Sequence, residues 1–112
     1  MTAPWLPAPS VDANTINDPP IANPDRKSTR QGATLAFPSA DLTANDVDPD
    51  GDVLTVLAVM ANDETHGTVR LAKDQVTYQP DPGFTGSASF GYVVADPRGA
   101  TSIGTVHVRV IP

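Results

Sequence analysis

The sequence predicts an all-β protein in which about seven short strands form two packed sheets. Twelve Pro and eight Gly residues in a chain of 112 indicate frequent turns. Asp outnumbers Glu by twelve to one, and Asp favours turns whereas Glu favours helices. No segment shows a helical period, whereas several show the two-residue alternation of a half-buried strand.

The chain length corresponds to one domain. Residues 1–18 are rich in Pro, Ala, Thr and Asn, which predicts a flexible tail or interdomain linker ahead of a domain spanning residues 19–112. The Pro-rich stretch at 17–25 should be extended, because residues before Pro avoid the helical region. It leads into a first strand that we expect at a sheet edge.

The expected strands then follow in order along the chain. Residues 34–37 form a brief apolar strand. Residues 53–59 (VLTVLAV) are apolar on both faces, which predicts a central, buried strand. Residues 68–72 and 75–79 flank Lys73-Asp74, which predicts a hairpin.

The last two strands show the clearest alternation. In residues 87–95 one face carries Phe90, Tyr92 and Val94. In residues 101–111 the sequence alternates between valines that we expect to face the core and polar residues that we expect to face solvent. The valines are Val106, Val108 and Val110, and the polar residues are Thr105, His107 and Arg109. Together the strands predict a Greek-key β-sandwich of the immunoglobulin or cadherin-like type.

Charge and composition exclude several functions. The net charge of −6 with seven Lys and Arg argues against nucleic acid and anionic membranes, which need clustered positive charge. No apolar run of about 18 residues is present, so we expect no membrane insertion. The absence of Cys excludes disulfides, thiolate zinc sites and thiol catalysis. We expect any export signal and anchor to lie outside this fragment.

The two histidines do not form a catalytic constellation. His66 precedes Gly67 in a predicted turn, and His107 lies on the outer face of the last strand. Neither is paired with a nucleophile in an elbow motif. We therefore expect no enzyme activity.

Four aspartates lie at alternate positions in the loop before residues 53–59, namely Asp46, Asp48, Asp50 and Asp52. The spacing resembles the start of a helix-flanked calcium loop, but the bidentate Glu required at the twelfth position is replaced by Leu57. Alternate side chains of an extended loop can nevertheless converge on a calcium ion, which takes six to eight oxygen ligands. The alternative is a solvated acidic turn.

The predicted fold brings further aspartates to this loop. In an immunoglobulin-type sandwich, the loops after the second and sixth strands share one pole, where the N-terminus also enters. Asp18 and Asp96 are therefore additional candidate metal ligands, with Arg98 as the plausible local base. A cation at this pole would stiffen the joint to whatever precedes the domain.

Several motifs occur together and in order from residue 17 to the end, namely NDPP, ANDVDPDGD, HGTV, YQPDPGFTG and SFGYVVAD. This set resembles the bacterial cadherin-like or immunoglobulin-like tandem-repeat domains, also called VCBS-type repeats. The resemblance implies a calcium-binding spacer in a large secreted or surface-anchored adhesin, located outside the cell. It also implies neighbouring repeats of the same chain as partners, and we expect the isolated domain to be a monomer.

The resemblance places the calcium ligands on the aspartates named above and adds Asp25, which could instead bond to the backbone or pair with Arg26 or Lys27. Two positions depart from the family pattern. The hairpin has Asp74-Gln75 in place of Asp-Gly, so the turn type could differ. After the sixth strand, Asp96 is followed by Pro97 and Arg98, and Arg98 could pair with an Asp and weaken a calcium site.

The alternative function is a protein- or carbohydrate-binding module appended to a larger surface protein or enzyme, with a cell-surface protein or glycan as the partner. Sugar sites usually display aromatic platforms. The one Trp here, Trp5, lies in the predicted tail, and the other aromatic residues sit at expected core positions. Protein contact through a strand edge or the acidic pole remains open.

Overall fold

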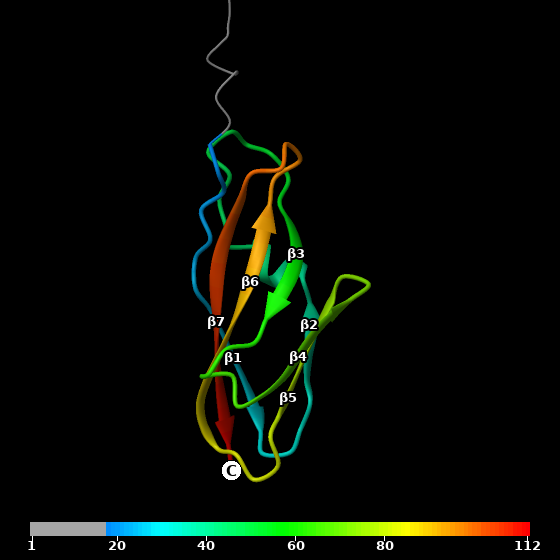
Figure 1. Cartoon of the computed structure of the whole chain (residues 1–112), viewed down its shortest axis with the longest axis vertical. Helices are drawn as coiled ribbons and strands as arrows, with labels where there is room; N and C mark the ends of the chain where they lie inside the picture. The colour runs from blue at the N-terminus through cyan, green and yellow to red at the C-terminus, as the bar shows by residue number, and fades with distance from the viewer. Residues whose placement is uncertain (1–17) are drawn as a thin grey trace, which may run out of the picture.

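The computed structural model describes residues 18–112 as a β-sandwich of two sheets (Figure 1). The predicted tail therefore lies outside the described residues, apart from Asp18. The seven strands and one short helix are β1 (Asp25–Arg30), β2 (Leu35–Pro38), α1 (Ala40–Thr43), β3 (Thr55–Met60), β4 (Gly67–Ala72), β5 (Gln75–Pro80), β6 (Gly86–Ala95) and β7 (Thr101–Ile111).

The strand order is β1-β7-β6-β3 in one sheet and β2-β5-β4 in the other. The sets β3-β6-β7 and β2-β5-β4 are those of the immunoglobulin sandwich, which confirms the predicted fold class. Strand β1 runs parallel to β7 and forms one edge of its sheet, as predicted for the first strand. No helix in the described part of the chain is long and apolar enough to cross a membrane.

The core lies between the sheets and is built mainly on β6 and β7, the two longest strands. The predicted alternation of these strands is confirmed, because the inward positions are buried and the outward positions of β7 are exposed. Phe90 on β6 stacks on Tyr78 of β5 across the sandwich, with ring centroids 6.1 Å apart. These paired aromatic rings join the two sheets at the centre of the molecule.

The hairpin between β4 and β5 turns at Lys73-Asp74, as predicted. Both residues have positive φ, at 51° and 63°, which is the backbone of a type I′ turn and matches the twist of the flanking strands. Gln75 already lies in β5, opposite Ala72. The hairpin therefore needs no glycine at position 75.

The prediction of a central, buried strand at residues 53–59 is wrong. Strand β3 spans Thr55–Met60 and lies at the edge of its sheet, where it pairs only with β6. The register shifts between Val56 and Ala58, so Leu57 falls at an irregularity and is 57% exposed. The continuous apolar run at residues 53–59 therefore does not indicate burial on both faces, because Leu57 lies at the bulge and Val53 is exposed.

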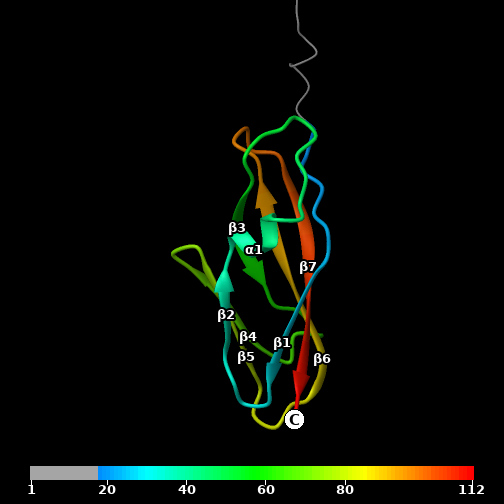
Figure 2. The same cartoon turned by 180° about the vertical axis from the view of Figure 1, so that it is seen from behind.

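A single helical turn, α1, interrupts the predicted all-β pattern between β2 and β3 (Figure 2). It is too short for a periodic sequence signal, since it contains four residues. Its one apolar anchor, Leu42, is completely buried against the core. The turn thereby closes the side of the sandwich beneath the acidic loop.

Gly104 on β7 makes room for the ring of Tyr92 on β6, its cross-strand partner. A Cβ atom at position 104 would lie within 2.6 Å of the Tyr92 hydroxyl oxygen, far inside van der Waals contact. Tyr92 is itself fully buried, so its ring is packed on all sides. A side chain at this position would therefore displace Tyr92 from the core.

We expect Gly104→Ala to lower the free energy of unfolding by about 1–3 kcal/mol, the usual cost of overpacking a core. Urea denaturation followed by circular dichroism measures this change. Thr105→Ala, at the exposed neighbouring position, is the control and should change stability by less than about 0.5 kcal/mol. Equal stability of the two variants would contradict this role of Gly104.

Candidate metal centre at the N-terminal pole

The acidic loop between α1 and β3, the turn between β6 and β7, and the segment entering at Asp18 meet at one pole of the sandwich (Figure 1). Each of Asp48, Asp52 and Asp96 places a carboxylate oxygen within 4.8 Å of the other two. Two of these residues come from the acidic loop and the third from the β6–β7 turn. The expected convergence of the two loops is therefore present.

Local hydrogen bonds hold the acidic loop and the β6–β7 turn in shape. The Asp48 carboxylate accepts a bond from the Asp50 amide at 2.9 Å, and Gly51 follows with a φ of 76°. In the other turn, Asp96 Oδ1 accepts bonds from the amides of Arg98 and Ala100. These are the local bonds that favour Asp in turns. They fix each carboxylate through one oxygen.

The second oxygens of Asp48 and Asp52 are buried and accept no hydrogen bond from the residues the structure describes. Arg98 Nε lies 4.0 Å from Asp52 Oδ2, which is too far for a hydrogen bond but close enough for attraction. Burial and then the charge of Asp48 raise the pKa of Asp52, and Arg98 opposes them. The Asp52 carboxylate thus lies where negative charge is unfavourable.

This arrangement can hold a hard cation. Calcium binds oxygens at about 2.3–2.6 Å, so two ligands of one ion lie at most about 5 Å apart. The separations among Asp48, Asp52 and Asp96 fall within that limit. A cation would supply the positive charge that the two buried oxygens lack.

Asp50 and Asp18 lie outside this group of three. Asp50 Oδ2 accepts a hydrogen bond from the Asp18 amide at 2.9 Å, which ties the entering segment to the acidic loop. Ile21 and Val47 continue this contact through two backbone hydrogen bonds. The N-terminal segment is therefore attached along the loop that carries the candidate ligands.

Asp46 also lies outside the group of three, because its carboxylate faces the interior. It accepts hydrogen bonds from the Tyr92 hydroxyl at 2.8 Å and from the Asn23 amide at 2.8 Å. Asp25, at the start of β1, lies 3.1 Å from the same hydroxyl. The even spacing of the four loop aspartates therefore conceals three environments: an outer cluster with Asp48 and Asp52, an inner network with Asp46, and the contact of Asp50 with the entering segment.

The inner network contains more acceptors than one hydroxyl can satisfy. The Tyr92 hydroxyl lies within 3.3 Å of Asp46, Asp25 and the Asn23 carbonyl, but it has one proton to donate. Burial is the main cause that raises the pKa of Asp25, and the nearby Asp46 charge adds to it. The sequence analysis placed Tyr92 on the core face but did not identify its hydroxyl as part of the site. The signal was available, because a buried Tyr hydroxyl usually finds a hydrogen-bond partner.

The comparisons with known proteins agree with this architecture. Residues 17–109 match the family model described as the bacterial Ig domain. The chain belongs to this family. Bacterial Ig domains are typically non-catalytic modules and are commonly extracellular or surface-exposed. No curated protein matches the chain.

Solved structures of low sequence identity share the fold of this bacterial Ig domain. One is a nucleoside hydrolase-related hypothetical protein from Saccharophagus degradans, associated with carbohydrate metabolism, with a TM-score of 0.53, 15% identity, and coverage of 88% of this chain and 27% of that one. Another is the endo-fucoidan hydrolase MfFcnA4 of glycoside hydrolase family 107, with a TM-score of 0.56, 15% identity, and coverage of 82% and 13%. The chain thus spans a small part of each of these proteins.

We expect Tyr92→Phe to destabilise the domain by about 1–3 kcal/mol, because it removes the donor that serves buried carboxylates. Tyr78→Phe is the matched comparison, since the Tyr78 hydroxyl is equally buried but donates to the neutral Thr65 carbonyl. Urea denaturation of both variants should show the larger loss for Tyr92→Phe. A larger loss for Tyr78→Phe would contradict the importance of this network.

We expect Asp25→Asn to stabilise the domain at neutral pH. A raised pKa means that the folded state binds the proton more tightly, so the contribution of Asp25 is favourable at acidic pH and is lost as pH rises through that pKa. Asn imitates the neutral carboxyl group at every pH. The stability difference should vanish at acidic pH, measured by urea denaturation across pH, whereas exposed Asp74→Asn should show no such trend.

Proposed function

We propose that this bacterial Ig domain is a non-catalytic structural module of the cadherin-like, VCBS type, stiffened by calcium and placed between neighbouring domains of an extracellular adhesin-like protein. The observation that carries the proposal is the pair of buried oxygens on Asp48 and Asp52, which accept no hydrogen bond in the described residues and face Asp96. A carboxylate oxygen that is shielded from water and accepts no hydrogen bond is costly, and a bound cation removes that cost. Arg98, 4.0 Å from Asp52 Oδ2, offsets part of the cost at Asp52, but no base among the described residues lies within 4.0 Å of the Asp48 carboxylate.

The position of the site supports a role at an interdomain joint. The segment that enters the domain is hydrogen-bonded to the acidic loop through Asp18 and Ile21. A cation on Asp48 and Asp52 would hold that loop in one conformation. The loop would then hold the entering segment, so that the preceding domain could pivot less freely.

The charge distribution makes cation binding favourable at this pole. Six aspartates lie there, at positions 18, 46, 48, 50, 52 and 96, with Arg98 as the one basic residue among the described residues. Elsewhere in residues 18–112, six acidic and six basic residues balance each other. The excess negative charge of the described domain is therefore gathered at the end where another domain would attach.

A second candidate function is an accessory glycan- or protein-binding module within a longer enzyme. The similar structures include a fucoidan hydrolase and a protein associated with carbohydrate metabolism, and in each the matched region is a small part of the chain. Exposed aromatic platforms would favour this function. In the described residues, however, Tyr78, Phe90 and Tyr92 are fully buried.

We expect calcium to stabilise the folded domain. Extracellular calcium modules have Kd values of about 10⁻⁴ to 10⁻³ M, so about 10 mM calcium should add about 1.4–2.7 kcal/mol to the free energy of unfolding. This corresponds to a rise in Tm of several degrees, measured by thermal melting with calcium and with EDTA. An unchanged melting curve would contradict the calcium proposal.

The double variant Asp48→Asn/Asp52→Asn should lose the calcium-dependent rise in Tm while remaining folded, because the core strands lie elsewhere. The control Asp63→Asn/Asp74→Asn removes the same charge from exposed positions away from the pole and should keep the rise. Loss of the rise in both double variants would indicate a general charge effect. Such a result would argue against a defined site.

A further inference from the structure

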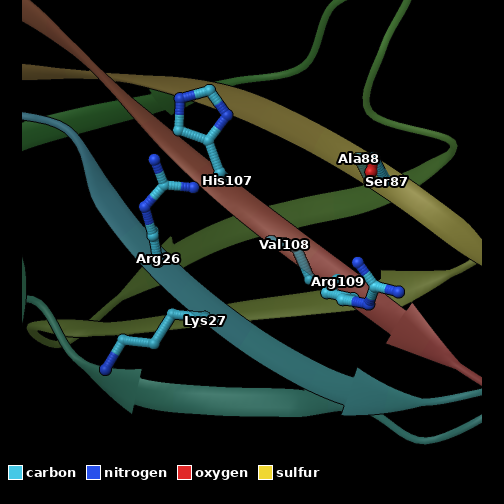
Figure 3. Close-up of a pocket in the computed structure, with 7 residues that line it drawn as sticks. All are labelled: Arg26, Lys27, Ser87, Ala88, His107, Val108 and Arg109. Carbon is cyan, nitrogen blue, oxygen red and sulfur yellow. The ribbon is translucent and has the colours of Figure 1, made fainter.

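Basic side chains gather on the outer face of the four-stranded sheet, far from the acidic pole. Arg26 on β1 lies opposite His107 on β7, and Arg109 lies between Ser28 on β1 and Ser87 on β6. Arg26, His107, Arg109 and Ser87 line an open depression of about 350 Å³. Figure 3 shows Arg26 and His107 projecting close together from adjacent strands, whereas Lys27 points away from them.

The arginines of this face, Arg26, Arg109 and Arg30 at the end of β1, have no carboxylate within 4.0 Å among residues 18–112. The two ion pairs in that part of the chain involve other bases, since Lys27 binds Asp41 and Arg98 approaches Asp52. Arg26 and Arg109, and Arg109 and Arg30, are diagonal neighbours across β1 and β7, within reach of each other's long side chains. The cationic face, defined as Arg26, Arg30, His107 and Arg109, therefore favours an anion from outside the chain.

The spacing of the cationic face is regular along the strands. Outward side chains recur every second residue, about 6.6–6.8 Å apart. The pairing register places Arg26, then Arg109, then Arg30 at successive outward levels. From Arg26 to Arg30 these levels span about 13 Å of strand, with Arg26 and Arg30 on β1 and Arg109 on β7. Such a spacing matches a linear polymer whose anionic groups are repeated along its length.

The acidic pole lies too far from Arg109 to cancel the attraction between that arginine and an external anion. Arg109 lies eight residues along β7 from Thr101, which follows the turn of the pole, so the two regions are about 27 Å apart. That distance is about three Debye lengths at physiological ionic strength. Asp63 and Glu64 lie beyond β6, where the Glu64 carbonyl accepts a hydrogen bond from the Ser89 amide. Arg109 is thus electrostatically separate from the pole, whereas Arg26 follows Asp25 of the inner network and lies nearer to it.

We propose that the cationic face binds a linear acidic polysaccharide through its sulfate or carboxylate groups. The planar guanidinium groups of Arg26 and Arg109 can each bind such an anion through two hydrogen bonds. The Ser87 hydroxyl and the His107 ring beside them offer hydrogen bonds to sugar hydroxyls. This site is independent of the calcium proposal, because none of its residues belongs to the metal cluster.

The composition of the depression favours a polysaccharide over other polyanions. Its lining includes no Phe, Tyr, Trp, Leu, Ile or Met side chain. Protein hot spots are enriched in Trp and Tyr as well as Arg, and single-stranded nucleic acids need aromatic rings for base stacking, so arginines without Trp, Tyr or Phe beside them fit both partners less well. A highly charged sugar polymer can be held by ionic hydrogen bonds without an aromatic platform.

The test is calorimetric titration of the full chain with heparin as the sulfated probe and alginate as the carboxylated probe, in EDTA so that calcium cannot bridge acidic groups. Arg26→Ser/Arg109→Ser should weaken binding at least tenfold. The control Arg70→Ser/Lys73→Asn removes the same charge from the other sheet and should change binding less than twofold. If Arg26→Ser/Arg109→Ser unfolds, Arg26→Lys/Arg109→Lys takes its place. This variant keeps both positive charges but cannot bind an anion through two hydrogen bonds from one side-chain plane, so binding should still weaken.

Binding of either polysaccharide with the expected variant pattern supports the proposal and names the anion, sulfate or carboxylate. Equal weakening by the two double variants would overturn it, because the interaction would then follow net charge alone. Tighter binding of polyglutamate or oligo-dT than of either polysaccharide would also overturn it, in favour of another class of partner. Absence of binding to both polysaccharides would overturn it directly.

Discussion

The organisation of the N-terminal pole depends on one buried hydroxyl group. Tyr92 extends from the central strand β6, and its oxygen contacts the entering segment at Asn23, the start of β1 at Asp25 and the acidic loop at Asp46. Gly104 on β7 leaves the space that the ring requires. Two segments that are distant in sequence, residues 23–25 and the acidic loop, thereby share one anchor on the buried strand β6.

This anchor separates the acidic loop into a structural part and a part available to a ligand. Asp46 is used inside, where hydrogen bonds from Tyr92 and Asn23 compensate its burial. Asp48 and Asp52 lie further along the loop and turn toward Asp96, and in the described residues the Oδ2 atoms of Asp48 and Asp52 accept no hydrogen bond. A rigid inner network is what allows an outer cluster of like charges to persist, because the loop cannot simply swing into solvent.

The sequence predicts the fold well wherever a local signal carries the information. The alternation in β6 and β7 and the turn at Lys73-Asp74 each reflect a local rule, and the structure confirms them. The β3 prediction failed because an apolar run has no periodicity to reveal an edge or a bulge. The fold topology was enough to predict that the loops carrying Asp48, Asp52 and Asp96 meet. The inward direction of the Asp46 side chain could not be predicted from the sequence, because it depends on side-chain orientation. The alignment of Arg26, Arg109 and Arg30 could not be predicted either, because it depends on the register between β1 and β7.

The parallel pairing of β1 with β7 has a mechanical consequence. The chain enters this pair at Asp25 and leaves it at Ile111, at opposite ends, and six residue pairs join the two strands in between. A tensile load between the two ends therefore acts along the strands and shears all of these backbone hydrogen bonds at once. A load applied to a hairpin would instead peel its bonds one after another. The pairing of the first and last strands therefore resists tension applied between the two ends of the domain.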